Sequence, residues 1–193
     1  MKSLSKTTTD ILLSQSAISK EDAEICSYGL EIFFASAIEL IAIFVISAFA
    51  GNFLPTLLFF AFFIPLRIYA GGYHADTKLK CFLVSLLVYF VFSVILAYLP
   101  QNLYVHTIVA EIAFTLTMVV VKAPVVHYNK SINTKEKSVY RKISLVVAFS
   151  EAVIIAAFML LDNKAYALAM SLGQLGESLS MLAALIKTKT TGK

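Results

Sequence analysis

The sequence predicts an all-α, polytopic membrane protein with about six transmembrane helices. Of its 193 residues, 59% are hydrophobic, which exceeds the roughly half that is usual in soluble domains. The apolar residues form long stretches, each able to span the roughly 30 Å of a bilayer's hydrocarbon core. Basic residues concentrate in alternate connections between these stretches. Together these three observations exclude an ordinary soluble domain.

Residues 1–27 precede the first apolar stretch and form a separate N-terminal segment. Lys, Ser, Thr and Asp interrupt this segment throughout, so it lacks the apolar region of a cleaved signal peptide. Ile11, Leu12 and Leu13 favour a short amphipathic helix, and Ser19-Lys-Glu-Asp22 has the form of a capping box that starts a second segment. We therefore expect residues 1–27 to lie on the cytoplasmic surface of the membrane.

Six apolar stretches divide the rest of the chain. They are expected near residues 28–50, 53–70, 77–99, 103–122, 143–162 and 165–186. Pro65, near the end of the second stretch, should kink that helix and steer the polar residues that follow. Glycine and polar residues dilute the sixth stretch, which indicates a helix packed in the protein interior. The six stretches form one transmembrane domain over 28–186, followed by a cytoplasmic tail at 187–193.

The distribution of basic residues predicts the orientation of the chain. With the N-terminus in the cytoplasm, fifteen of the 16 Lys and Arg residues lie on that side, and only Lys164 lies outside. This asymmetry follows the positive-inside rule, and it places both termini and the connection between the second and third spans in the cytoplasm. The two cysteines, Cys26 and Cys81, then face a reducing compartment, where Cys26 is expected to be structural.

The connection between the second and third spans, residues 67–81, is a polar island between two long apolar runs. Gly71 and Gly72 should end the preceding helix, because paired glycines destabilise helical backbone. Either Asp76 or Thr77 can then cap the next helix with a side-chain oxygen. The sequence therefore predicts a turn between two helices at this point.

A histidine and a cysteine share this connection, His74 in the turn and Cys81 in the following helix. In an unbroken helix the two would lie about 10.5 Å apart, whereas a loop at 71–75 would let His74 approach the sulfur to about 3 Å. Lys78 on the same face and the positive end of the helix both favour the thiolate, so Cys81 is a candidate nucleophile. The alternative is a small, inert residue of a transmembrane helix. No metal or other cofactor is expected, because zinc needs three or four protein ligands and nothing near His74 and Cys81 supplies a further soft or imidazole ligand.

The run Ala70-Gly-Gly-Tyr-His-Ala-Asp-Thr-Lys-Leu-Lys-Cys81, in a basic chain with six apolar stretches, resembles the accessory gene regulator B (AgrB) family. Members of this family are membrane cysteine endopeptidases that process a quorum-sensing propeptide. Weaker similarity extends to Cys26-Ser-Tyr-Gly-Leu-Glu31 and to Lys122-Ala-Pro124. The resemblance implies that Arg67 and Gly72 belong to the same motif as the histidine and the cysteine.

The resemblance also implies a catalytic pair, with Cys81 as the nucleophile and His74 as its acid and base. The Cys81 thiolate would attack a peptide carbonyl near the C-terminal segment of an AgrD-type propeptide, while His74 protonates the departing amine. The resulting enzyme thioester would pass to a nucleophilic side chain of the substrate, which closes a thiolactone ring. Either Asp76 or Glu31 could orient His74. The family further implies a homodimer in the plasma membrane of a Gram-positive bacterium.

The longest polar connection, residues 122–142, carries six basic residues and the single acid Glu136. It can act as a topological determinant attracted to anionic lipid, at about 1 kcal/mol for each basic residue near the surface. It can also bind substrate, because propeptides of the family resembled carry an acidic C-terminal part. The candidate substrate-binding residues are Lys130, Lys135, Lys137, Arg141 and Lys142. Nucleic-acid binding is not expected, since no reading motif accompanies these charges.

Four acidic residues fall near the middle of predicted spans, at a depth where no Lys or Arg is expected. They are Glu39, Glu111, Glu151 and Glu177. An acid at the bilayer centre costs about 3 kcal/mol even on a lenient scale, so these side chains must face one another, other polar groups or water. One interpretation is a structural network of hydrogen-bonded carboxyl groups. The other is a polar cavity, which would also suit a small transporter or channel with the Gly-Gly-Tyr-His turn as its gate.

Overall fold

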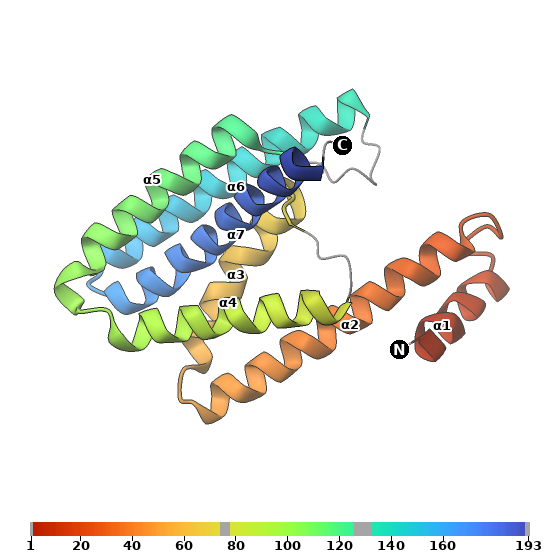
Figure 1. Ribbon diagram of the computed structural model, residues 1–193, viewed down its shortest axis with the longest axis horizontal. Helices are drawn as coiled ribbons and strands as arrows, with labels where there is room; N and C mark the ends of the chain where they lie inside the picture. Colours follow the sequence, from red (N-terminus) through yellow and green to blue (C-terminus); the bar gives the residue numbers. More distant parts are fainter. Residues whose placement is uncertain (1, 74–77, 126–132, 192–193) are drawn as a thin grey trace.

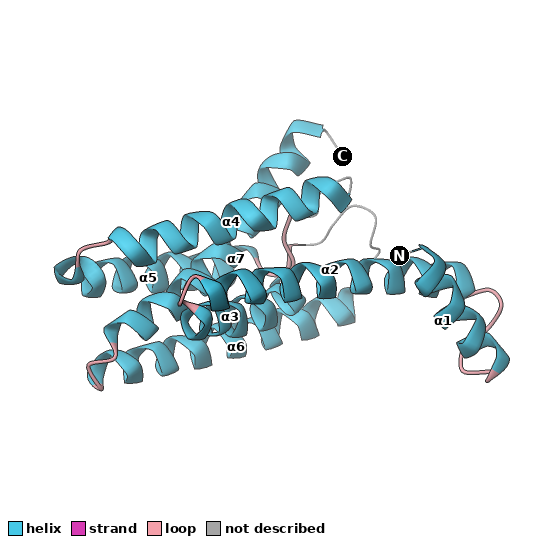
Figure 2. Cartoon of the chain, turned by 90° about the horizontal axis from the view of Figure 1, so that it is seen from below, coloured by secondary structure: helices cyan, strands magenta, loops and turns pink. Residues whose placement is uncertain are grey.

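The computed structural model describes residues 2–73, 78–125 and 133–191, which form α-helices joined by connecting segments (Figure 1). Within these residues the helices are α1 (Lys2–Ser14), α2 (Ala23–Phe49), α3 (Phe53–Ala70), α4 (Lys78–Tyr98), α5 (Tyr104–Lys122), α6 (Thr134–Leu160) and α7 (Lys164–Thr191). One turn of 3-10 helix, η1 (Gln101–Leu103), precedes α5. The helices account for nearly all of the described chain (Figure 2), so the predicted all-α class is confirmed.

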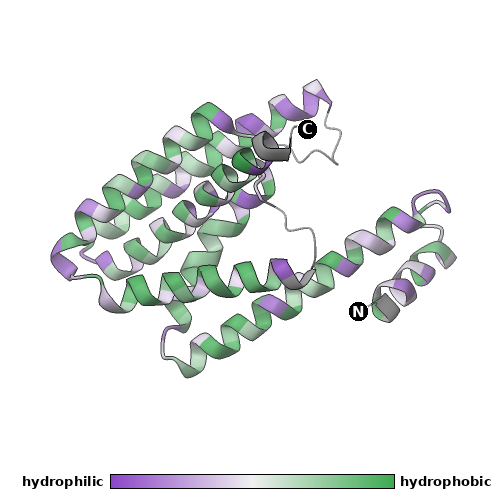
Figure 3. Cartoon of the chain, in the orientation of Figure 1, coloured by the Kyte–Doolittle hydropathy of each residue, from purple (hydrophilic) through white to green (hydrophobic). Residues whose placement is uncertain are grey.

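Five of the described helices are long and apolar enough to cross a membrane. They are α2, α3, α5 together with η1, α6 and α7. The third predicted span corresponds to α4, whose apolar part, Phe82–Tyr98, is shorter than these five. Many large apolar side chains point outward from the bundle, and Figure 3 shows hydrophobic residues along the helices with hydrophilic ones gathered near several helix ends. A multi-pass helical membrane protein explains this distribution.

Helix α7 lies at the centre of the bundle, where it packs against α3, α4, α5 and α6 (Figure 1). Every residue from 167 to 174 is buried. The contact with α3 is especially close, because a Cβ added at Gly173 would clash with the carbonyl of Phe59 and lie 3.3 Å from the Phe62 Cβ. The predicted interior position of the sixth span is therefore confirmed.

The described helix ends fall into two groups at opposite ends of the bundle (Figure 1). The connections at 50–52, 99–103 and 161–163 lie at one end. The last turns of α3, α5 and α7 lie at the other. This second end also holds the polar turn that follows α3, so residues far apart in the sequence meet there.

The N-terminal segment forms the predicted helix α1, which packs on α2 away from the main bundle (Figure 1). Between the two helices, the Ser19 Oγ accepts a hydrogen bond from the Asp22 N–H at 3.2 Å and donates one to the Asp22 Oδ2 at 2.7 Å. This contact is the serine half of the predicted capping box. The N-cap of α2 is Asp22, whose side chain makes no capping hydrogen bond, and the helix begins at Ala23, five residues before the predicted apolar span.

Candidate active site

The polar turn begins where α3 ends. Helix α3 stops at Ala70, and Gly71 follows with a φ of 75° and Gly72 with a φ of 155°. Side chains other than glycine rarely adopt these backbone angles, so the two glycines permit the chain to leave the helix here. The predicted end of the second span is therefore confirmed at the expected residues.

A segment from another part of the chain lies directly beside this turn. The Val125 N–H donates to the Ala70 carbonyl at 2.8 Å, and Gly71 and Val125 form an isolated parallel bridge. A Cβ at Gly71 would clash with the carbonyl of Val125. The long basic connection after α5 therefore begins in contact with the turn, although more than fifty residues separate the two in the sequence.

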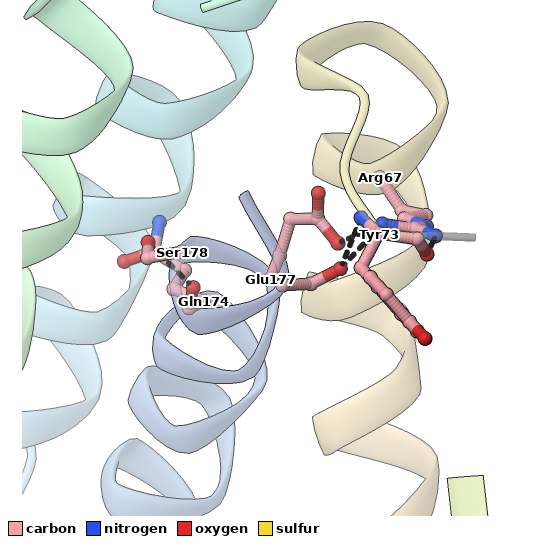
Figure 4. Close-up of polar contacts among 6 residues, drawn as sticks. Arg67, Tyr73, Gln174, Glu177 and Ser178 are labelled. Atoms are coloured by element: carbon pink, nitrogen blue, oxygen red, sulfur yellow. Dashed lines mark hydrogen bonds and ion pairs between the residues drawn. The ribbon is translucent and has the colours of Figure 1, made fainter. Parts of the chain in front are cut away.

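Arg67, in the last turn of α3, reaches across to α7. Its Nη1 lies 3.5 Å from the Glu177 Oε2 and donates to the Ser180 Oγ at 2.5 Å, and its Nη2 donates to the Tyr73 carbonyl. Figure 4 shows Glu177 on the side of α7 that faces α3, next to Arg67 and Tyr73. The guanidinium group thus connects the end of α3, the turn and α7.

Tyr73 completes this arrangement, which we call the turn cluster: Arg67, Gly72, Tyr73, Glu177 and Ser180. The Tyr73 N–H donates to both the carbonyl oxygen and the Oγ of Ser180, at 3.0 Å each. The Lys187 Nζ lies 5.1 Å from the centre of the Tyr73 ring, within the range of a cation–π contact. Helix α7 therefore binds the turn through backbone and side-chain groups.

The pairing of Arg67 with Glu177 corrects the expectation that no cation lies at the depth of the four acids. Helices α3 and α7 run in the same direction, and Arg67 is the fifteenth residue from Phe53 while Glu177 is the fourteenth from Lys164. Both therefore lie about 20 Å from the starts of their helices. Hydropathy placed Arg67 at the end of one span and Glu177 in the middle of another. The two lie at the same level because α3 has 18 residues and α7 has 28, so the end of the shorter helix lies beside the middle of the longer one.

The other buried acids also face polar groups of α7 rather than one another. Glu111 accepts a hydrogen bond from the Ser171 Oγ at 2.6 Å, and Glu151 accepts one from the Gln174 Nε2 at 3.0 Å. The Oε1 of Glu39 is buried without a hydrogen-bond partner in the described part of the chain. The expectation of polar surroundings is therefore confirmed for three of the four acids, with α7 as their common neighbour.

The candidate catalytic residues lie at the edge of what the structure describes. His74 and Asp76 fall outside the described residues. Cys81 and Lys78 belong to the first turn of α4 by their backbone, and their side chains are not described. Glu31, the other candidate for orienting the histidine, is half-buried on α2. The predicted approach of His74 to Cys81 therefore stays a prediction.

The candidate substrate-binding residues line the start of α6, apart from Lys130, which lies outside the described residues. Lys135, Lys137, Arg141 and Lys142 are exposed. Asn133 and Glu136 form a capping box that begins this helix, so the predicted loop already becomes helical at Thr134. Arg141 donates to the Val120 carbonyl at 3.0 Å, which ties α6 to the last turn of α5.

Comparison with known proteins places this geometry in a family. The sequence matches the accessory gene regulator B family over residues 5–182, which is nearly the whole chain. The chain belongs to the AgrB family. No curated protein and no solved structure gives a significant match. AgrB proteins are generally known as the peptidases that process AgrD in agr quorum sensing, so the resemblance found in the turn motif is confirmed at the level of the family.

Sequence reasoning did not assign Tyr73 and Ser180 to the site, and it treated Glu177 only as one of four buried acids. Glu177 and Ser180 lie three residues apart, which places them on one face of an α-helix. An acid in an apolar span requires a partner, and Arg67 was a cation at a span end. These two signals together could have pointed to the turn cluster of this AgrB protein.

Proposed function

We propose that the protein is a membrane cysteine endopeptidase that cleaves an AgrD-type propeptide near its C-terminal segment and enables thiolactone ring closure. The observation that carries this proposal is the family match, which spans the whole turn motif from Arg67 to Cys81. The fold agrees with it, because α3, α5 and α7 end near the turn at one end of an apolar bundle (Figure 1). A peptide in the aqueous phase can reach that end while the apolar surface stays in lipid.

The proposed chemistry begins with the Cys81 thiolate. Cys81 is the fourth residue of α4, so it lies at the helix end that carries partial positive charge and favours a thiolate. The thiolate attacks the peptide carbonyl, and His74 protonates the amine as the carbon–nitrogen bond breaks. The acyl group stays on the enzyme as a thioester. A nucleophilic side chain of the substrate then takes the acyl group, closes the ring and returns the thiolate.

We place the turn at the cytoplasmic face of a six-span protein with both termini on that side. The span added to the five long apolar helices is α4, the third predicted span, which supplies the direction change between α3 and α5. Lys164, the single basic residue assigned outside, lies 2.8 Å from the Asp162 Oδ1. The hydrogen bond and the charge of Lys164 hold the pKa of Asp162 below its ordinary value. The other fifteen Lys and Arg residues are assigned to the cytoplasmic side.

The basic connection beside the turn is the proposed docking site for the acidic part of the propeptide. Lys135, Lys137 and Lys142 are exposed on the first turns of α6, and Lys130 precedes them. Arg141 already binds the Val120 carbonyl, so its contribution includes holding α6 against α5. The bridge between Gly71 and Val125 places the start of this connection against the turn. A homodimer remains part of the proposal through family membership.

The test uses the full-length protein in lipid nanodiscs and a propeptide labelled at both ends. Cleavage into two labelled fragments is expected for the wild type and for Cys26→Ala. Cys81→Ala and His74→Ala should abolish it, and Cys81→Ser should lose nearly all turnover because an unactivated serine is a poor nucleophile. Undiminished cleavage by Cys81→Ala would overturn the proposal. The proposal would also be overturned if the wild type and Cys81→Ser both transported the intact substrate across the membrane and neither cleaved it.

A further inference from the structure

We propose that Glu177 and Ser180 of α7 are positioning residues for the reaction, because they hold the turn from which the chain continues to His74. This inference rests on the proposed function, which makes the placement of that turn matter. Neither residue belongs to the turn motif, and more than ninety positions separate each of them from it. Three sets of contacts support this role, and each is one step from α7 to the turn: those of the Tyr73 backbone, of the Arg67 guanidinium and of Gly72.

The first step concerns Tyr73, whose two backbone polar groups are both held from outside the turn. Its N–H donates to Ser180 twice, and its carbonyl accepts from the guanidinium of Arg67. A peptide bond is planar, so fixing the Tyr73 carbonyl also fixes the plane of the bond that leads to position 74. The direction in which the chain leaves the turn is therefore set by α3 and α7.

The second step concerns Arg67, whose own position depends on Glu177. The Glu177 side chain is fully buried, and its two oxygens make no hydrogen bond within the described residues. The ion pair with Arg67 is therefore the contact that offsets burial of this carboxylate, since a buried charge needs a partner. Ser180 adds a hydrogen bond to the same Nη1 at 2.5 Å. Glu177 and Ser180 together fix the Arg67 guanidinium where it donates to the Tyr73 carbonyl.

The third step concerns Gly72, which is buried directly against these groups. A Cβ at this position would clash with the Arg67 Nη1 and would lie 2.7 Å from the Ser180 Oγ and 2.9 Å from the Glu177 Oε1. Only a residue without a side chain can sit this close. The backbone of the turn and the polar groups of α7 therefore fit as one packed unit.

The packing of α3 against α7 extends beyond this cluster. Phe59 and Phe62 pack α3 against α7 around Gly173, and they belong to an extended apolar core. Figure 4 shows Gln174 and Ser178 on the side of α7 away from Arg67. These contacts remain when Glu177 or Ser180 changes. Variants of the cluster should therefore fold and insert while the turn loses its support.

The decisive experiment compares matched variants in the labelled propeptide assay. Glu177→Gln and Ser180→Ala should lower kcat between about tenfold and about a hundredfold, because small displacements of a reacting group cost this much. KM should stay within about twofold, since docking uses other surfaces. The controls are Glu151→Gln and Ser178→Ala, which make the same chemical changes outside the turn cluster. The hydrogen-bond partner of Glu151 is Gln174, and that of Ser178 is Thr115. Both controls should cleave within about threefold of the wild type.

Coupling between Arg67 and Glu177 supplies a second measurement. The double variant Arg67→Gln/Glu177→Gln should lose no more activity than Arg67→Gln alone, because the two residues act as one unit. If the activity losses of the two single variants add in the double variant, the position of Arg67 does not depend on Glu177, and this part of the inference is contradicted. Alkylation of Cys81 without substrate should also slow in Glu177→Gln and Ser180→Ala but not in the controls, since a displaced histidine no longer favours the thiolate.

Hydrogen exchange of the Tyr73 amide separates failure of this inference from failure of the proposed function. Exchange should be at least about tenfold faster in Glu177→Gln and Ser180→Ala than in the two controls, whether or not the protein cleaves any peptide. If the wild type cleaves through Cys81 while the cluster variants match the controls in kcat, the positioning role is overturned and the peptidase stands. If the wild type cleaves no peptide, the exchange rates still test this inference. Equal exchange of the Tyr73 amide in all variants would then show that Glu177 and Ser180 do not hold the turn.

Discussion

Replacing Gly72 by alanine is the sharpest perturbation of the turn that the structure offers. The new Cβ would meet three polar groups of the turn cluster at once, and the φ of 155° is one that alanine rarely adopts. Backbone strain of this kind costs about 1–3 kcal/mol. The Ser180 Oγ would have to move from 2.7 Å to an ordinary contact distance of 3.4 Å, and Arg67 would have to leave its place above Tyr73.

A displacement approaching 1 Å at a site that positions a reacting group lowers the rate by up to about a hundredfold. We therefore expect Gly72→Ala to reduce kcat between about tenfold and about a hundredfold, and to lower the unfolding free energy by about 1–3 kcal/mol. The assay is cleavage of the labelled propeptide in nanodiscs, with thermal unfolding of the same samples to measure the stability loss.

Gly29→Ala is the matched control, because a Cβ at Gly29 in α2 meets no atom within 4 Å and no positive φ is involved. Alanine in a helix interior is about 1 kcal/mol more favourable than glycine, so this variant should keep its activity and gain slightly in stability. Equal cleavage by the two alanine variants would show that the turn tolerates a side chain, and the geometric reasoning about Gly72 would have to be given up.

Three further predictions follow from the buried acids, the cysteines and the topology. Glu111→Gln and Glu151→Gln should each change the unfolding free energy by no more than about 1 kcal/mol and the cleavage rate by no more than about threefold, because Gln can still accept the hydrogen bond. Loss of cleavage in a folded variant would contradict this. Cys81 should alkylate faster than Cys26 between pH 6 and 8, and equal rates across that range would exclude an activated thiolate. A membrane-impermeant thiol reagent should label Gly51→Cys in intact cells but not Cys81, and labelling of Cys81 from outside would reverse the proposed topology.

The helical framework could be predicted from hydropathy, and the differences arise where helices extend beyond the membrane. The predicted second span, 53–70, agrees with α3 because Gly71 stops the helix where the apolar run stops. The predicted fifth span begins at 143, whereas α6 begins at Thr134, because a capping box starts the helix among polar residues. Hydropathy measures the part of a helix that lipid surrounds, and caps decide where the helix itself begins.

The candidate site could be predicted only where it is local in sequence. The glycine pair, the histidine and the cysteine lie within one short run, so the sequence alone could single them out, and the approach of His74 to Cys81 stays a prediction. The contacts of Arg67 with Glu177 and Ser180 join residues more than a hundred positions apart, and no periodic pattern encodes such a pairing. It arises from the parallel course of α3 and α7, which depends on the packing of Phe59 against Gly173.

The central position of α7 has a consequence for biosynthesis. The turn at 71–73 is translated about a hundred residues before its partners Glu177 and Ser180 on α7, so a nascent chain carries Cys81, the proposed nucleophile, before it carries the groups that contact the turn. Contacts of such large sequence separation form late in folding. An unfinished chain in the membrane would therefore hold an unsupported turn, and the site would become competent only after α7 has entered the bundle. Assembly order would then protect neighbouring peptides from an incompletely folded peptidase.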